Sequence, residues 1–269
     1  MPNTLYPPLK PRSFAELLDA VLQIFRLTLL KCLPYATLAI ISGQLWMLYY
    51  ESHGRLPVLD GNDPIGVALY GAGTLVFVML SMTILLRQST IAAGRPVTAS
   101  SDLLDTLKRA PAIVAISLLA AAAVAVLILP ALALAPPYRI AGTLVMLAPA
   151  IYIWVVLQFS LPALVLARKG VLASLAYSFR LVRGNWWRVA AIYGTGMAII
   201  LALWTLVATL VAVALSDNGA GDAAIARAIT SAATLAVFAV GLTFYSALTL
   251  ALFGDLEVRR TTANMPGRQ

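Results

Sequence analysis

The sequence contains a single cysteine, Cys32, and a single histidine, His53. One cysteine excludes an intramolecular disulfide and a cluster of thiolate metal ligands. One histidine excludes most of the metal sites and catalytic sites that are built on several histidines. We therefore expect no catalytic residue, no metal ligand and no bound cofactor.

Charged residues are also scarce. They make up 11% of the 269 residues, whereas hydrophobic residues make up 61%. Soluble domains carry about 25% charged residues, so this chain has too few charges to cover the surface of a soluble fold of its size. A helix needs roughly 20 apolar residues to cross a hydrocarbon core of about 30 Å. Several runs reach that length without an ionisable side chain, which predicts an all-α polytopic membrane protein.

About six transmembrane helices are predicted, within a single integral membrane domain over residues 1–269. The predicted spans are Cys32–Tyr50, Ile65–Leu86, Pro111–Ala135, Ile140–Ala167, Trp187–Leu215 and Ala228–Phe253. We expect Pro130 to bend or interrupt the third span and Pro162 to kink the fourth near its cytoplasmic end. Pro136 and Pro137 are expected to form the tight turn between these two spans.

Lysine and arginine are distributed unequally between the two sides of the predicted spans. Of the 19 such residues, only Arg55, Arg139 and Arg227 fall on the side that does not hold the termini. The positive-inside rule then places both termini in the cytoplasm. We interpret the formal charge of +8 as basic loops that face anionic lipid headgroups, and we expect no nucleic-acid partner.

The basic segments before spans 1, 3 and 5 contain patterns of amphipathic helices. Ser13-Phe-Ala-Glu16 is a capping box that opens a helix with an apolar side. Asp102-Leu-Leu-Asp105 resembles the first of these segments, and apolar residues repeat at helical spacing over 172–182. Gly184 is expected to end the third amphipathic helix in a left-handed conformation.

This order suggests three units of one amphipathic helix and two spans, over residues 12–86, 100–167 and 171–253. Any chain with cytoplasmic loops before alternate spans would show similar spacing, so a true repeat and a chance pattern both stay open.

Two segments contain residues that could form a protease site or a metal site, but both are better interpreted as ordinary loops. Gly219-Ala-Gly-Asp222 matches the GxGD string of intramembrane aspartyl proteases, but those enzymes need a second aspartate in contact, and no predicted span contains one. His53 shares an external loop with Glu51, Asp60 and Asp63, at a spacing that is irregular for metal ligands. We interpret both segments as hydrated loops.

Apart from Arg188, at the beginning of the fifth, the predicted spans contain no Asp, Glu, Lys, Arg or His, which argues against a proton-coupled pump. Their polar side chains are expected to form hydrogen bonds between helices. Gln44 and Gln158 are the two that could instead line a cavity.

The segment 180–188 combines basic and aromatic residues at one predicted membrane boundary. It supplies the candidate lipid-interface residues Arg180, Arg183, Trp186, Trp187 and Arg188. One interpretation is an interfacial helix, with arginines on lipid phosphates and tryptophans at headgroup depth. A sharper one is a specific site for an anionic lipid or a protein partner. The arginines could instead pair with acidic residues on neighbouring segments, such as Asp102, Asp105, Asp255 or Glu257.

Two of these segments resemble a known group of proteins. Arg12-Ser-Phe-Ala-Glu-Leu-Leu-Asp19 and Ser178-Phe-Arg-Leu-Val-Arg-Gly-Asn-Trp-Trp-Arg188 resemble the bacterial YciC-like inner-membrane proteins, and also the membrane domain attached to some glycerophosphoryl diester phosphodiesterases. The resemblance covers most of the chain. It implies a multi-pass protein of the bacterial inner membrane, and it carries over no catalytic residue because the phosphodiesterase's catalytic domain has no counterpart here.

We therefore expect a non-enzymatic inner-membrane protein that acts through lipid or protein contacts, in membrane organisation or in support of envelope or lipid-handling machinery. The alternative is a transporter or permease subunit for an apolar or amphipathic solute, and a lipid enzyme is the third hypothesis. A polar cavity at mid-membrane would favour the transporter hypothesis. A dry, close-packed bundle would favour a protein that acts through lipid or protein contacts, and a headgroup-sized pocket flanked by carboxylates would favour a lipid enzyme. Membrane lipids are the expected partners, and protein partners and homo-oligomerisation are left open.

Overall fold

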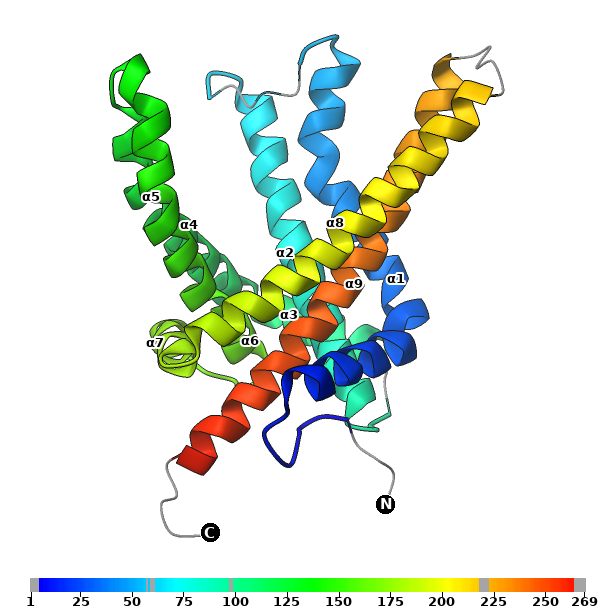
Figure 1. Ribbon diagram of the computed structural model, residues 1–269. Helices are drawn as coiled ribbons and strands as arrows, with labels where there is room; N and C mark the ends of the chain where they lie inside the picture. The colour runs from blue at the N-terminus through cyan, green and yellow to red at the C-terminus, as the bar shows by residue number, and fades with distance from the viewer. Residues whose placement is uncertain (1–4, 57, 59–60, 97–98, 218–222, 264–269) are drawn as a thin grey trace.

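The computed structural model describes residues 5–56, 58, 61–96, 99–217 and 223–263, and all secondary-structure elements in these residues are helices (Figure 1). They are α1 (Phe14–Ser52), α2 (Pro64–Ala92), α3 (Ala99–Lys108), α4 (Ala110–Leu132), α5 (Pro136–Leu157), α6 (Ser160–Val165), α7 (Val171–Val182), α8 (Trp186–Asp217) and α9 (Ala223–Ala263). The described residues include six spans that are long and apolar enough to cross a membrane. The protein is therefore a polytopic helical membrane protein, as the sequence predicts.

Amphipathic helices precede spans 1, 3 and 5, in the predicted order. The first is the beginning of α1, and its capping box is present: Glu16 N–H donates to Ser13 Oγ, and Ser13 N–H donates to Glu16 Oε2 at 2.7 Å. The other two are α3 and α7, each set off from the span that follows by a short turn. Gly184, between α7 and α8, has a φ of +85°, which confirms the predicted left-handed residue. Whether the three units are equivalent stays a prediction.

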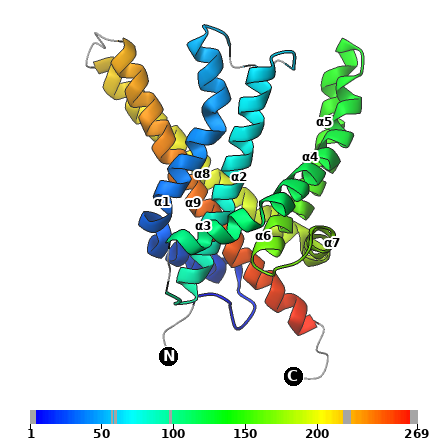
Figure 2. The same cartoon turned by 180° about the vertical axis from the view of Figure 1, so that it is seen from behind.

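The helices converge at one end of the molecule and separate at the other. The beginning of α1, the end of α9, α3 and α7 lie at the lower end in Figures 1 and 2. The end of α1 and the beginning of α2 lie at the upper end, as do the end of α4 and the beginning of α5, and the end of α8 and the beginning of α9. Towards that upper end the α4–α5 pair and the α8–α9 pair lean away from α1 and α2 in opposite directions. We call the lower end the basic end, because the segments there carry most of the lysines and arginines.

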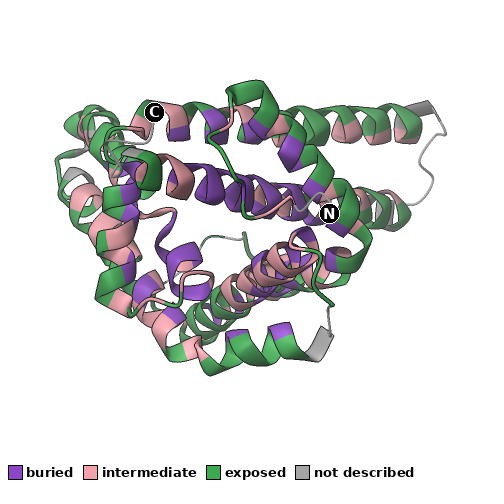
Figure 3. Ribbon diagram, turned by 90° about the horizontal axis from the view of Figure 1, so that it is seen from below, coloured by how far each residue is buried: buried purple, intermediate pink, exposed green. Residues whose placement is uncertain are grey.

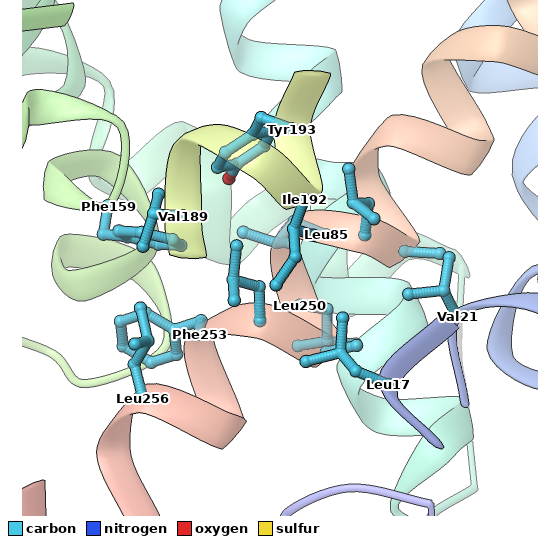
Figure 4. Packing of buried hydrophobic residues seen from close by; sticks show 14 of the residues in the cluster. Leu17, Val21, Leu85, Phe159, Val189, Ile192, Tyr193, Leu250, Phe253 and Leu256 are labelled. Atoms are coloured by element: carbon cyan, nitrogen blue, oxygen red, sulfur yellow. The ribbon is translucent and has the colours of Figure 1, made fainter. Parts of the chain in front are cut away.

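The hydrophobic core lies towards the basic end, around α9. Every residue from 246 to 256 is buried, and seen from below α9 is the most continuously buried helix (Figure 3). Leu250 and Phe253 of α9 pack with Leu17 of α1, Leu85 of α2 and Ile192 of α8 in one cluster (Figure 4). A helix that is buried on all sides occupies the centre of a bundle.

Helices α1 and α2 approach each other closely at a glycine. A Cβ atom added at Gly73 would overlap the backbone carbonyl oxygen of Ser42, whereas a Cβ added at Gly71 would meet no atom within 4 Å. Small residues at such a position allow two membrane helices to pack backbone against backbone.

The structure corrects two expectations about prolines. Pro136 and Pro137 do not form the turn between the third and fourth spans: α5 begins at Pro136, and the turn lies before it. Proline is tolerated in the first turn of a helix, where its missing N–H has no intrahelical acceptor in any case. The fourth span is broken rather than only kinked, since α5 ends at Leu157 and α6 begins at Ser160. Pro162 cannot donate to the carbonyl of Gln158 and its ring crowds that carbonyl, which places the break there.

Candidate functional site

A cavity of about 300 Å³ lies about halfway along α2, between α2, α4, α5–α6 and α9. We call it the apolar cavity, because most of its lining is hydrophobic. The hydrophobic lining residues are Phe77, Val78, Met82, Leu85, Ile116, Ala120, Trp154, Leu157, Leu161, Pro162 and Leu242. The interior between the hairpins is therefore not fully packed.

Polar groups occupy part of the wall of the apolar cavity. Gln158, at the break between α5 and α6, donates through Nε2 to the hydroxyl of Tyr245. The hydroxyl of Tyr193 donates to Thr249 Oγ1 at 3.1 Å, and Thr249 also lines the cavity. Ser117 Oγ on the facing helix is buried without a hydrogen-bond partner. Of the two glutamines considered from the sequence, Gln158 lines this cavity, and the helix break places it there.

A second cavity, of about 500 Å³, opens at the basic end. It lies between the end of α2, α3, the connection from α6 to α7, and α9. We call it the charged pocket, because its lining includes the ionisable residues Arg95, Asp102, Asp105, Arg109, Arg168 and Glu257. Three arginines and three carboxylates make its wall formally neutral but strongly polar.

Two of these charged groups are engaged within the protein. Arg109 Nη1 donates to the backbone carbonyls of Leu164 and Val165, at 2.8 and 2.9 Å. Basic side chains often satisfy the last carbonyls of a helix in this way, so Arg109 holds the end of α6 in place. Tyr177 donates its hydroxyl to Glu257 Oε1 at 2.7 Å. Burial and the nearby Glu257 raise the pKa of Tyr177 to about 12, which keeps it a neutral donor.

Asp102 is buried, and only part of its hydrogen-bonding capacity is used. Only 9% of the residue is exposed, and its Oδ2 atom has no hydrogen-bond partner. The nearest cationic group is Arg87 Nη1, at 3.9 Å, a separation too long for a hydrogen bond. Burial raises the pKa of the Asp102 carboxyl, Arg87 lowers it, and Asp105 raises it further. Buried polar groups without a partner are uncommon and call for an explanation.

The two cavities follow one another along the same four segments. Residues 77–85 of α2 line the apolar cavity, and the next residues line the charged pocket. The same order holds on α5–α6 and on α9, and Arg109 of the charged pocket directly precedes α4, whose residues 116–120 line the apolar cavity. One buried cluster separates the cavities: it contains Ile116, which lines the apolar cavity, and Val165, which lines the charged pocket. Buried apolar side chains therefore lie between the two cavities.

The predicted lipid-interface residues fall into two groups. Arg180, Arg183 and Trp187 are exposed, and Trp187 is 80% exposed. Trp186 instead stacks on the ring of Tyr152, with centroids 5.7 Å apart. The side chains of Arg180, Arg183 and Trp187 are thus accessible at the basic end, while Trp186 packs against α5.

Arg188 belongs to a polar cluster around Asp255, which joins three separate segments. Asp255 is fully buried, and its Oδ2 atom accepts hydrogen bonds from Arg188 Nη2 at 3.3 Å and Arg259 Nε at 2.8 Å. Its Oδ1 atom accepts from the backbone N–H of Arg12 at 2.6 Å. Both guanidinium groups also donate to the backbone carbonyl of Arg12. The alternative pairing of arginine with acidic residues is therefore confirmed for Arg188 and Asp255.

In the α1–α2 connection, which was considered for a metal site, few of the candidate ligands are in contact. His53 is exposed, and its Nδ1 atom lies 2.8 Å from the carbonyl oxygen of Tyr49. Asp63 caps α2 and pairs with Arg55 at 3.7 Å. Asp60 and the motif over 219–222 lie outside the described residues. Within the described part of the chain, no group of three or more metal-binding side chains is present.

Comparisons with protein-family models, curated proteins and solved structures found no match. The site is therefore interpreted from its own geometry. Sequence reasoning missed the two cavities, since the residues that line them are spread over four spans and three connections. Only the polar residues within apolar spans, such as Gln158, gave any signal.

Proposed function

We propose that this chain is a non-enzymatic protein of the bacterial inner membrane that binds lipid, in support of membrane organisation or of envelope or lipid-handling machinery. The observation that carries the proposal is the apolar cavity at mid-depth, which is followed towards the basic end by the charged pocket. A hydrophobic space next to a charged one matches a molecule with an acyl chain and a polar head. The resemblance of the two basic segments to YciC-like proteins agrees with this proposal.

The sizes of the two cavities fit this proposal. Small-molecule sites are concave spaces of about 300–1,000 Å³, mostly apolar, with a few placed polar groups. The apolar cavity meets this description at about 300 Å³. Burial of acyl methylene groups there would stabilise the bound lipid by little relative to the bilayer, which is equally apolar. Selectivity must therefore come from the shape of the cavity and from the polar groups at its two ends.

A cavity-filling substitution tests lipid binding. Ala120 lines the apolar cavity, whereas Leu118 on the same helix is exposed. We expect Ala120→Trp to lower the amount of lipid that remains with the protein after detergent purification, and Leu118→Trp to leave it unchanged. Native mass spectrometry of both variants measures the retained lipid. Equal retention in the two variants would argue against the apolar cavity as the lipid site.

The second candidate is a transporter or permease subunit for an apolar or amphipathic solute. The succession of the two cavities along the same helices favours it, because a solute could pass from one to the other if the buried apolar side chains between them moved. Proteoliposomes with a fluorescent lipid analogue in one leaflet distinguish the candidates. Loss of leaflet asymmetry that depends on the protein supports transport, and binding without such loss supports the lipid-binding role.

The proposed orientation places the basic end in the cytoplasm. Ser52 is exposed at the opposite end and Thr262 at the basic end, while the native Cys32 is buried. In a Cys32→Ala background, a cysteine at position 52 should react with an impermeant thiol reagent in spheroplasts. A cysteine at position 262 should react only after permeabilisation, and the reverse pattern would overturn the orientation.

Exposed basic side chains at the basic end are proposed to contact anionic headgroups. Arg180 and Arg183 are exposed near Trp187, and each basic residue near an anionic surface contributes about 1 kcal/mol. Hydrogen exchange of α7 in nanodiscs tests this contact. Protection should fall when anionic lipid is replaced by zwitterionic lipid, and the double variant Arg180→Gln/Arg183→Gln should show the same fall in anionic nanodiscs.

A further inference from the structure

We infer that the charged pocket binds a zwitterionic headgroup that joins a phosphodiester to a primary ammonium group, as in phosphatidylethanolamine. This inference rests on the proposed lipid binding and specifies which head the site selects. It follows from the signs of the charges in the pocket, from which of them are already engaged, and from the position of the apolar cavity.

The charges of the pocket disfavour a ligand of one sign. An anionic head would meet the carboxylates of Asp102, Asp105 and Glu257, and a purely cationic ligand would meet three arginines. Like charges brought together at a binding site cost free energy and reject the wrong partner. A head with one positive and one negative group satisfies both parts of the wall.

Two arginines remain available for the phosphate. Arg109 is occupied by the carbonyls of α6. In the part of the chain that the structure describes, no ion pair or side-chain hydrogen bond involves Arg95 or Arg168, and both are exposed. Arginine presents a planar set of donors that matches phosphate oxygens. These two side chains, from the α2–α3 and α6–α7 connections, supply the anion-binding part of the pocket.

Asp102 and Asp105 supply the part that binds the cation. They lie three residues apart on α3, so they share one side of that helix. Asp102 is buried, lines the pocket and has an oxygen without a hydrogen-bond donor. Arg87 Nη1 forms an ion pair with this oxygen at 3.9 Å, but it donates no hydrogen bond to it. A ligand group that is both positively charged and rich in N–H bonds would complete the pairing of this carboxylate.

The Asp102 oxygen that lacks a hydrogen-bond donor also distinguishes between zwitterionic headgroups with a quaternary ammonium group and those with a primary ammonium group. A quaternary ammonium group has no N–H bond and is usually recognised by aromatic faces. A primary ammonium group carries three donors and forms charge-assisted hydrogen bonds with carboxylates. The pocket therefore favours phosphoethanolamine over phosphocholine. Because the apolar cavity follows directly along the same helices, we assign the head to a lipid rather than to a free solute.

The test measures which lipid the full-length protein retains. The protein is first reconstituted in nanodiscs that contain equal amounts of phosphatidylethanolamine, phosphatidylcholine and phosphatidylglycerol. Loosely associated lipid is then removed with detergent, and the lipid that remains bound to the protein is quantified by mass spectrometry. One charge-assisted hydrogen bond gives an expected enrichment of phosphatidylethanolamine over phosphatidylcholine of about tenfold. Enrichment of phosphatidylglycerol over both, or no enrichment, would overturn the inference.

Variants of the pocket supply the second part of the test. Asp102→Asn should reduce the ratio of phosphatidylethanolamine to phosphatidylcholine to near one. Because Asp102 is buried beside Arg87, the exposed Asp105→Asn serves as a second variant that leaves this buried pair intact, and it should lower the ratio severalfold. Asp19→Asn is the control, since Asp19 is exposed on α1 and bonds to Gln23. An unchanged ratio in Asp105→Asn would contradict the assignment.

A competition step identifies the source of the headgroup. Soluble glycerophosphoethanolamine carries the same head without acyl chains, and it should not displace the retained lipid at millimolar concentration. Displacement would assign the pocket to a free solute instead. If the parent protein retains no lipid at all, the proposed function fails together with the headgroup. Retained lipid without a preference between heads removes only the headgroup assignment.

Discussion

Helices α8 and α9 lie next to each other in the chain and in space, but their surroundings differ. None of the most apolar stretch of α8 is buried within the protein, whereas 67% of the corresponding stretch of α9 is buried. Of the two, α8 is the more apolar. In a membrane protein, therefore, greater hydrophobicity does not identify the core, because lipid is as apolar as a leucine side chain.

The buried residues of α9 itself are small or polar as often as they are large and apolar. Thr243, Ser246 and Thr249 are buried on α9, and Asp255 extends the series to the basic end. Small and hydroxylated residues let helices approach closely and form hydrogen bonds between them. The comparison teaches that close packing and polar pairing, rather than hydrophobicity, distinguish the central helix from a lipid-facing one.

Removal of the buried carboxylate of α9 should have the largest effect. Asp255→Ala leaves the guanidinium groups of Arg188 and Arg259 without their carboxylate partner. Breaking a buried ion pair from one side costs about 3–5 kcal/mol, and we expect this loss in the free energy of unfolding, measured by denaturant titration in mixed micelles. Glu51→Ala, exposed at the opposite end, is the control. Equal stability of the two variants would mean that the Asp255 cluster does not hold α9.

The second prediction compares the same substitution in the two helices. Leu250 of α9 is fully buried, whereas Leu210 of α8 is 60% exposed. Leu250→Ala should lower the free energy of unfolding by about 2–5 kcal/mol because it leaves a cavity. Leu210→Ala should change it by less than about 0.5 kcal/mol. Similar losses would show that α8 is covered in the membrane, for example by a second copy of the chain.

The third prediction extends the comparison to the α1–α2 pair. Gly73→Ala places a methyl group against the backbone of Ser42, and overpacking of this kind costs about 1–3 kcal/mol. Gly71→Ala meets no neighbouring atom and should stabilise the helix by roughly 0.5–1 kcal/mol. Thermal denaturation measures the change in stability of each variant. Changes of opposite sign would support close contact between α1 and α2 at Gly73, and changes of the same sign would refute it.

The smallest effect is expected for a buried polar side chain next to α9. Gln88 of α2 is fully buried, and its Nε2 atom donates to Thr28 Oγ1 at 3.2 Å and to the carbonyl oxygen of Thr243 at 2.9 Å. Hydrogen bonds between membrane helices contribute about 0.6 kcal/mol on average and about 1.7 kcal/mol at most. Gln88→Leu should lower the free energy of unfolding by an amount in that range. A more stable Leu variant would indicate that the unpaired Oε1 atom of Gln88 outweighs both hydrogen bonds.

Local features of the fold could be predicted from the sequence because they depend on neighbouring residues. Run length gave the six spans, Ser13 and Glu16 gave a capping box, and Gly184 gave a left-handed residue. The turn assigned to Pro136 and Pro137 was wrong, since two prolines suit the first turn of a helix as well as a loop.

The candidate site could be predicted only in part, because it depends on contacts between distant segments. Arg188 and Asp255 are 67 residues apart, and each cavity is lined by at least four helices. The sequence offered Asp255 as one of several acidic partners, and nothing in the local pattern around Arg188 selected it. The central position of α9 in the bundle could not be predicted from the sequence either, because its hydropathy does not exceed that of α8.

The position of α9 in the chain has a consequence for biosynthesis. At a translation rate of about 5–20 residues per second, the 67 residues between Arg188 and Asp255 take on the order of several seconds to emerge. During that interval the nascent helices already in the bilayer lack the helix around which they pack. Arg188 then lies at the membrane boundary without its carboxylate, where lipid phosphates are the anions within reach. We therefore expect lipid headgroups to act as temporary counter-ions for Arg188 until the last helix is inserted.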